Sequence, residues 1–285
     1  MASSDKAKEY IFEDLQTTFP AEFVAHVQLN RPKKYNAINS TIFHNLALIF
    51  DKLSLDPDVR VILLSGSGPH FSAGLDVTGA SSSGPVSNPT ESEDIARRTW
   101  KVRRHMLTYQ NGISAIERCE KPVIGLFHGI SYGAAVDIAT AADIRYCSQG
   151  VRFSVKEVDV GLAADVGTLS RLPKVGVSYS WAKEMVYTAR EFGAEEAGKV
   201  GFVSRVLGSK EELEREGLEL AKVIAKKSPV AVQSSKAIWD FSRDRTVADG
   251  LAFTAAWNSA MVQSEDVKKA MMSGLRKTKT SFEKL

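Results

Sequence analysis

The stretch that decides the fold is residues 121–168, KPVIGLFHGISYGAAVDIATAADIRYCSQGVRFSVKEVDVGLAADVGT. The run at 121–128 is short, mostly apolar and entered through Lys-Pro, which predicts a strand. Residues 129–133, GISYG, begin and end with glycine, and they predict a tight turn. Residues 134–142 are small and apolar except for one carboxylate, and they predict a helix. The organising unit of the chain is therefore expected to be a strand, a turn and a helix.

Three acids in this stretch indicate its chemistry. Asp137 interrupts the apolar helix, and Glu157 and Asp165 follow in sequence typical of loops. An ionised carboxylate in apolar surroundings must be paired or must take up a proton. Three acids set among small, apolar residues therefore indicate proton transfer. Three further acids are interpreted as caps, ion-pair partners or other structural groups: Asp76, Asp143 and Asp159.

With this stretch included, the chain alternates strands and helices up to residue 148, which predicts an α/β core with parallel strand pairing. We expect strands at residues 23–31, 60–65 and 143–148. We expect a helix at 40–55, capped by Ser40, and a long helix ending near residue 118. The polar insertion at residues 79–93 is expected to be a mobile loop. Beyond residue 172 we expect helices almost throughout, at 178–188, 194–200, 210–227 and from 229 onward.

The composition excludes several classes of protein. With 285 residues, 44% apolar and 25% charged, the chain has the composition of a soluble globular protein. A net charge of +3 is too small to indicate nucleic-acid binding. Two cysteines, Cys119 and Cys147, provide neither a disulfide framework nor a zinc spacing. The sequence has no apolar run of the roughly 18 residues that a membrane span needs, so no membrane association is expected.

The ends of the chain give an expectation for its location. The N-terminus carries acids and has neither the apolar core of a signal peptide nor the Arg-rich, acid-poor pattern of a mitochondrial presequence. The last three residues, Glu283-Lys284-Leu285, match the peroxisomal Ser-Lys-Leu signal at two positions. We therefore expect the peroxisome in preference to the cytoplasm.

The turn at 129–133 matches the G-x-S-x-G pattern of hydrolase nucleophiles, with Ser131 at its centre. All five histidines precede this serine: His26, His44, His70, His105 and His128. The hydrolase order Ser, acid, His is therefore excluded, and other triad orders remain open. We interpret Ser131 as a small residue in a tight turn beneath a close-packed helix.

A second glycine-rich turn, at residues 65–74, lacks the patterns of nucleotide phosphate loops. The sequence around residues 72–76, SAGLD, nevertheless lets the backbone approach a ligand closely. Another exposed backbone N–H is expected at the start of the helix near Ala134. Two N–H groups that converge on one carbonyl oxygen form an oxyanion hole, and a helix N-terminus adds a favourable potential.

Several segments together resemble the enoyl-CoA hydratase/isomerase (crotonase) superfamily. They are LNRPKKYNAIN at 29–39, FSAGLD at 71–76, residues 121–148, KEVDVGLAADVGTLSRLP at 156–173 and NSAMVQSEDVKKAM at 258–271. Within it, the fourth segment resembles the Δ3,5-Δ2,4-dienoyl-CoA isomerases. In plain hydratases, glutamates fill the places of Asp137 and Glu157, and the third acid is absent. The triplet here, with Asp165, has the dienoyl isomerase arrangement.

The resemblance implies an α/β fold, a crotonase-type spiral of ββα repeats with a C-terminal helical region. It implies a spiral core at residues 1–200, a helical trimerisation region at 201–285, and assembly as trimers or hexamers. The thioester oxygen of an acyl-CoA would lie between the backbone N–H groups of Leu75 and Ala134. The sequence departs from the family at Gly133-Ala134-Ala135, where three glycines are common, and the added methyl groups are expected to narrow the pocket or shift the helix.

By the same resemblance the reaction is isomerisation of 3,5-dienoyl-CoA to 2,4-dienoyl-CoA in the β-oxidation of unsaturated fatty acids. Glu157 would be the base at C2, Asp165 the acid at C6, and Asp137 an electrostatic or hydrogen-bonding partner. No metal or cofactor is expected, because coenzyme A is part of the substrate. Contacts to coenzyme A are expected from one loop and one turn: Arg31, Lys33, Lys34, Ala37 and Ala73.

Two alternatives remain open on the sequence alone. One is an enoyl-CoA hydratase or Δ3-Δ2-enoyl-CoA isomerase, for which Asp165 would be dispensable. The other is a non-catalytic crotonase-like binding protein, for example an RNA-binding protein, whose affinity would fall steeply with salt.

Overall fold

The computed structural model describes residues 2–78, 94–276, 278 and 280–285, with side chains from residue 5 onward. Its centre is a six-stranded sheet in the order β1-β2-β3-β4-β6-β9. The strands are β1 (Leu15–Ala21), β2 (Val24–Leu29), β3 (Val61–Gly66), β4 (Val123–Phe127), β6 (Ile144–Ser148) and β9 (Arg205–Leu207). From β2 onward all neighbours are parallel, which confirms the expected α/β core. Strand β1, which pairs antiparallel with β2, was not expected.

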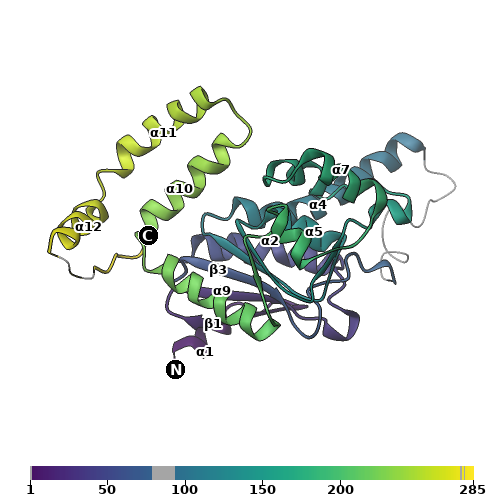
Figure 1. Cartoon of the computed structure of the whole chain (residues 1–285), viewed down its shortest axis with the longest axis horizontal. Helices are drawn as coiled ribbons and strands as arrows, with labels where there is room; N and C mark the ends of the chain where they lie inside the picture. Colours follow the sequence, from purple (N-terminus) through teal and green to yellow (C-terminus); the bar gives the residue numbers. More distant parts are fainter. Residues whose placement is uncertain (1, 79–93, 277, 279) are drawn as a thin grey trace.

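Helices cover both faces of this sheet (Figure 1). One face carries α2 (Ser40–Leu55), α4 (Ile95–Arg118) and α5 (Ala134–Ala141), and the other carries α9 (Lys210–Ala225). The alternation of side chains along β3 explains the two layers: Ile62 and Leu64 belong to the core beneath α2 and α4, whereas Val61 and Leu63 belong to the core beneath α9. The insertion at 79–93, expected to be a loop, lies outside the described residues.

The helix at 40–55 forms as expected, but its cap is Asn39 and not Ser40. The side chain of Asn39 accepts a hydrogen bond from the backbone N–H of Ile42 at 2.8 Å. Ser40 is already inside the helix, and its hydroxyl lies 2.7 Å from that of Tyr109 on α4. Asparagine and serine are nearly equivalent as caps, so the adjacent pair left the start of the helix ambiguous by one residue.

A second, three-stranded sheet replaces the turn expected at residues 129–133. It contains β5 (Ile130–Tyr132), β7 (Arg152–Ser154) and β8 (Phe192–Gly193). Ser131, in the middle of β5, is fully buried, in agreement with a packing role. An isolated bridge joins Ser131 to Ser72, with the N–H of Tyr132 donating to the carbonyl of Ser72 at 3.0 Å. This bridge brings the two glycine-rich segments together.

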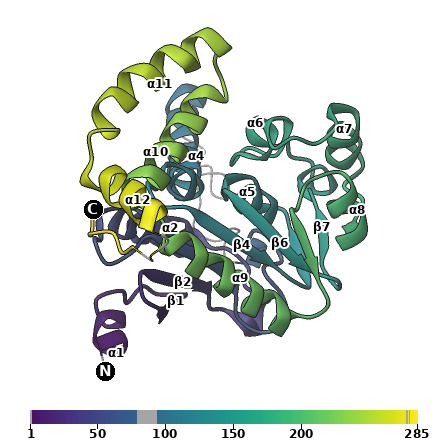
Figure 2. The same cartoon turned by 60° about the vertical axis from the view of Figure 1, so that its left-hand side comes forward.

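The C-terminal part is helical, as expected. Helices α10 (Pro229–Ser242), α11 (Val247–Met261) and α12 (Glu265–Arg276) form an arm that projects from the body (Figures 1 and 2). The division at residue 200 stays a prediction. Strand β9 and helix α9 follow that boundary, yet they belong to the large sheet and the layer that covers it.

Shorter helices complete the described chain: α1 (Ala2–Ala7), η1 (Pro32–Lys34), η2 (Glu157–Val160), α6 (Thr168–Arg171), η3 (Leu172–Lys174), α7 (Tyr179–Thr188) and α8 (Ala194–Lys199). A search of the described residues finds no helix with the length and apolar character needed to cross a membrane.

Candidate active site

Two glycines bring the backbone of residue 75 next to that of residue 134. A Cβ added to Gly74 would lie 2.9 Å from the carbonyl oxygen of Tyr132 and 3.6 Å from the Cα of Gly133. Gly74 also has a φ of +93°, a conformation that favours glycine. The two chain segments therefore touch at these glycines, and Leu75 and Ala134 are the residues that immediately follow.

Neither the backbone N–H of Leu75 nor that of Ala134 has an acceptor within the described part of the chain. Around Leu75, the N–H of Ile38 donates to the carbonyl of Gly74 and the N–H of Asp76 donates to the carbonyl of Ile38, both at 2.8 Å. This pattern leaves the N–H of Leu75 unused. Ala134 is the first residue of α5, where a backbone N–H has no intrahelical acceptor. Both N–H groups are thus available to a carbonyl oxygen, and the assignment as an oxyanion hole stays a prediction.

The methyl groups of Ala134 and Ala135 are buried, with 5% and 0% of each residue exposed. Both residues belong to the main apolar core. Their effect on the acyl pocket stays a prediction.

Asp137 lies in the first turn of α5 and is only 1% exposed. Its Oδ1 accepts hydrogen bonds from the backbone N–H of Thr168 at 2.5 Å and from the hydroxyl of Thr168 at 2.7 Å. Burial raises the pKa of Asp137 to about 6, and the bonds from Thr168 and the charge of Arg171 oppose this rise. The carboxylate is therefore held in a fixed position with its charge partly stabilised.

Glu157 is the first residue of η2, and it faces the start of α5. Its Oε1 would lie 3.4 Å from a Cβ at Gly133, the residue before the N–H of Ala134. Its Oε2 is buried and has no hydrogen-bond partner among the described residues. Burial, together with the charges of Asp137 and Asp165, raises the pKa of Glu157 to about 7. A half-buried carboxylate with a free oxygen and a raised pKa is suited to accept a proton near neutral pH.

Asp165 lies in the loop between η2 and α6. Its backbone carbonyl accepts a hydrogen bond from Nε2 of Gln110 on α4 at 2.7 Å, which ties the loop to that helix. The charge of Asp165 acts on both Asp137 and Glu157, so the structure brings the three acids within electrostatic reach. The side chain of Asp165 is exposed in the single chain, although an apolar setting was expected for the proton donor.

The three acids interpreted as structural have the expected partners. Asp76 pairs with Arg31 at 2.9 Å, and Asp143 pairs with Lys236 on α10 at 2.7 Å. Asp159 is exposed and pairs with Lys156 at 3.1 Å.

The residues expected to contact coenzyme A lie on the loop at 31–37 and on the turn that holds Ala73, but Arg31 already has hydrogen-bond partners there. Its guanidinium donates to the carbonyl of Ala37 at 2.5 Å and to Asp76 at 2.9 Å. Lys33 and Lys34 are exposed, and the N–H of Ala73 donates to the carbonyl of Tyr35. Arg31 thus holds the loop in shape, and a contact from any of these residues to coenzyme A stays a prediction.

Thr168 and Arg171 are site residues that the sequence patterns did not predict. A signal for both exists, because a buried Asp137 requires hydrogen-bond donors and a nearby cation. The segment 165–171 contains the hydroxyl and the guanidinium that meet this need.

The α/β sheet with its C-terminal helical arm has the architecture of the crotonase-type enzymes. The family model described as enoyl-CoA hydratase/isomerase matches residues 21–284, and the chain belongs to this family. An enoyl-CoA hydratase from Bacillus anthracis has the same fold, with a TM-score of 0.85 over 95% of this chain and 99% of that chain. At 22% identity that similarity concerns the fold alone. The expected crotonase-type fold is confirmed.

Sequence relatives are more specific. The mitochondrial Delta(3,5)-Delta(2,4)-dienoyl-CoA isomerase of Homo sapiens is 45% identical over 94% of this chain and 81% of its own length. The peroxisomal enzyme of the same name from Arabidopsis thaliana is 43% identical over 92% of this chain and 93% of its own. A short-chain-enoyl-CoA hydratase of Clostridium acetobutylicum is 30% identical over 90% of this chain and 92% of its own length. The resemblance to dienoyl-CoA isomerases is thereby confirmed.

Proposed function

We infer that the protein is an isomerase that converts 3,5-dienoyl-CoA to 2,4-dienoyl-CoA in the β-oxidation of unsaturated fatty acids. The observation that carries this inference is the third acid, Asp165, whose charge acts on both buried acids beside the paired amides. A hydration needs one such pair of acids, whereas moving two double bonds needs a proton donor farther along the chain. The relatives that carry this reaction in their names, at 45% and 43% identity, support the same reaction.

The proposed reaction begins at C2, where the carbonyl and the adjacent double bond acidify the proton. Glu157 takes that proton, and the electron pair is delocalised onto the thioester oxygen through the carbonyl and onto C4 and C6 through the two double bonds. The N–H groups of Leu75 and Ala134 stabilise the negative charge there. Asp165 then donates a proton to C6, and the electrons return to leave double bonds at C2 and C4. This chemistry requires neither a metal nor a redox cofactor.

The proton balance of this cycle explains why Asp165 is exposed. One turnover leaves Glu157 protonated and Asp165 ionised, so both must exchange protons before the next turnover. The exposed carboxylate of Asp165 has direct access to water for this step. Asp137 remains ionised in the proposed reactive form, where its charge raises the pKa of Glu157 and makes it a stronger base.

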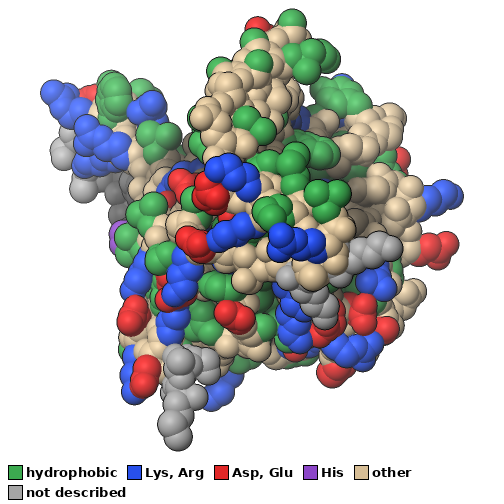
Figure 3. All heavy atoms as spheres, turned by 90° about the vertical axis from the view of Figure 1, so that its left-hand side faces the viewer, with side chains coloured by type: hydrophobic (Ala, Val, Ile, Leu, Met, Phe, Trp, Pro, Cys, Tyr) green, Lys and Arg blue, Asp and Glu red, His purple; other side chains and the backbone are tan. Residues whose placement is uncertain are grey.

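Substrate binding and assembly are part of the proposal. Lys33 and Lys34, both exposed, are proposed to attract the phosphates of coenzyme A, with backbone contacts from Ala37 and Ala73. The C-terminal arm presents exposed apolar side chains, including Trp239, Leu251, Met271 and Leu275. Figure 3 shows the face of the molecule toward which the arm projects, with hydrophobic side chains at its surface. We propose that such surfaces join copies of the chain into a trimer or hexamer.

For the location we propose the peroxisome, on the basis of Lys284-Leu285, which match the last two positions of the peroxisomal Ser-Lys-Leu signal. The relative from Arabidopsis thaliana is described as peroxisomal and that from Homo sapiens as mitochondrial. Imaging a fusion that leaves residues 283–285 free, with and without Leu285, tests this assignment.

The pH dependence of the rate is the first test of the proposed base. Because Glu157 must be ionised and its pKa is raised to about 7, we expect kcat to rise as the pH increases through about 7. Asp137→Asn removes a charge that raises this pKa, so the acidic limb should move to lower pH while the maximal rate falls. The measurement is the ultraviolet absorbance of the conjugated product between pH 5 and 9. A wild-type profile without this acidic limb would contradict the role of Glu157.

A further inference from the structure

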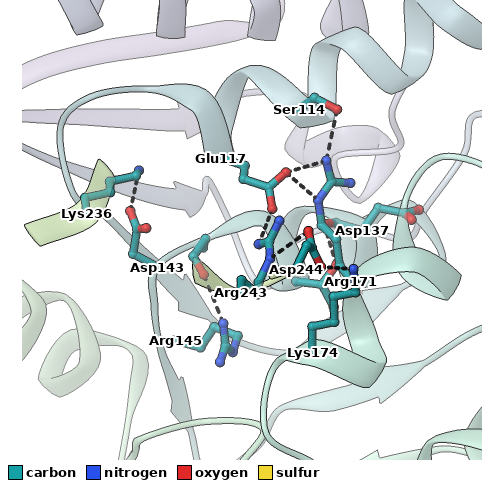
Figure 4. A network of polar contacts seen from close by, with 12 residues as sticks. Ser114, Glu117, Asp137, Asp143, Arg145, Arg171, Lys174, Lys236, Arg243 and Asp244 are labelled. Atoms are coloured by element: carbon teal, nitrogen blue, oxygen red, sulfur yellow. Dashed lines mark hydrogen bonds and ion pairs between the residues drawn. The ribbon is translucent and has the colours of Figure 1, made fainter. Parts of the chain in front are cut away.

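Arg171 on α6 links the buried acid Asp137 to helix α4. The side chain is only 11% exposed. Its Nη2 donates to the hydroxyl of Ser114 at 2.9 Å and to Oε2 of Glu117 at 2.8 Å, and its Nε donates to the same carboxylate oxygen at 3.0 Å. Figure 4 shows the guanidinium reaching toward these two residues of α4. A guanidinium held by three hydrogen bonds has a fixed position.

Gly167 allows this guanidinium to lie close to Asp137. A Cβ at Gly167 would collide with Nη1 of Arg171, and it would lie 3.7 Å from Oδ1 of Asp137. The two groups thus border the space that any other side chain at position 167 would fill. The backbone of Gly167, with a φ of +152°, also favours glycine. At this range the positive charge of Arg171 favours the ionised form of Asp137.

Glu117 in turn is held from two sides. Its other oxygen, Oε1, accepts a hydrogen bond at 2.5 Å from Nη1 of Arg243 on α10. Helix α4 therefore presents one polar face, with side chains spaced four and three residues apart, to the segment at 165–171. The three contacting residues on that face are Gln110, Ser114 and Glu117.

The groups that act on the charge of Asp137 come from each neighbouring element. Thr168 and Arg171 on α6 favour the ionised form, and Asp165 in the preceding loop disfavours it. Glu157 on η2 is coupled to it by repulsion. On α4, Glu117 partly neutralises Arg171. Arg171 is the cation named among these groups. The balance between the ionised and the protonated form of Asp137 therefore depends on it.

We propose that Arg171 is a positioning residue for the isomerisation: held by Ser114 and Glu117, it keeps Asp137 ionised and so strengthens Glu157 as the base. This proposal rests on the proposed function. It adds a residue that never contacts the substrate, and it gives helix α4 a part in setting the charge of the site.

Two substitutions of opposite sign test the proposal. Arg171→Gln removes the cation, so Asp137 ionises less readily. The coupled pair of Asp137 and Glu157 should then lose its last proton about one pH unit higher, and the acidic limb should move to higher pH by that amount. Glu117→Gln removes the anion that partly neutralises Arg171, so the acidic limb should move to lower pH. Arg171→Lys keeps the charge and should restore the limb to the wild-type position, even with a lower kcat. Each profile of kcat against pH is measured with the 3,5-dienoyl-CoA assay.

The controls separate this proposal from a structural role and from the proposed function itself. Arg118→Gln, at an exposed arginine of α4 that pairs with Asp51, should leave the profile unchanged. If Arg171→Gln does not fold, the other two variants still test the acidic limb. It should lie at lower pH in Glu117→Gln and at the wild-type position in Arg171→Lys. Loss of activity with unmoved acidic limbs in all folded variants would overturn the proposal. A wild-type enzyme without isomerase activity would instead overturn the proposed function.

Discussion

Asp165→Asn is expected to lower kcat for the formation of 2,4-dienoyl-CoA by about 100- to 10,000-fold, the range of general acid catalysis. The amide has no proton of suitable acidity to give to C6. Because Asp165 is exposed and only its backbone is tied to Gln110, the substitution should not change the melting temperature. The measurement is the ultraviolet absorbance of the conjugated product under saturating substrate.

The matched control is Asp159→Asn, which changes an equally exposed acid on the helix that carries Glu157. We expect its kcat to match that of the wild type, because Asp159 has no part in the proposed proton transfers. Wild-type kcat in Asp165→Asn would contradict the proposed donor. If 2-enoyl-CoA hydration then proved the faster reaction and required Asp137 and Glu157, the chain would be a hydratase. Salt-sensitive RNA binding without catalysis would indicate the non-catalytic alternative.

Gly74→Ala is expected to lower kcat by about 100- to 1,000-fold, the cost of losing one oxyanion donor. The new Cβ would lie 2.9 Å from the carbonyl of Tyr132, at a backbone φ of +93° that alanine rarely adopts. The chain must shift to relieve both, and this shift moves the N–H of Leu75 away from that of Ala134. Because the donor acts mainly in the transition state, KM should change less than kcat.

Gly150→Ala is the control for this variant, because a Cβ at Gly150 meets nothing within 4 Å. Its kcat and melting temperature should match those of the wild type. A Gly74→Ala protein that folds and keeps its full kcat would show that the N–H of Leu75 does not stabilise the oxyanion.

Local patterns in the sequence predicted most of the large sheet and the helices. The apolar run at 121–128 and the small residues at 134–142 identify β4 and α5 without tertiary information, because each has its own periodicity. Strand β5 could not be predicted in this way. It has three residues, and its pairing partners in β7 lie about twenty residues further along the chain. Another non-local pairing, the bridge between Ser72 and Ser131, places Gly74 against Gly133.

Local sequence patterns also pointed to the acids of the candidate site, but not to the residues that hold them in place. Acids in apolar sequence singled out Asp137, Glu157 and Asp165 as candidates, and the structure buries Asp137, half-buries Glu157 and leaves Asp165 exposed. The role of Arg171 depends on contacts with residues 54 and 57 positions away, which no local pattern contains. The apolar residues that flank Asp165 in the sequence predicted a buried setting. The residue is exposed instead, because its exposure depends on the path of the loop at 161–167 after η2, which local sequence does not determine.

Hydrogen exchange at C2 of the substrate tests the central claim most directly. In D2O, Asp165→Asn should exchange the C2 proton of 3,5-dienoyl-CoA through Glu157 and return the substrate unconverted, because protonation at C6 is blocked. Glu157→Gln should show neither exchange nor conversion, and the wild type should place deuterium at C6 of the product. Exchange that persists in Glu157→Gln, or that disappears together with conversion in Asp165→Asn, would contradict the division of labour between these two acids.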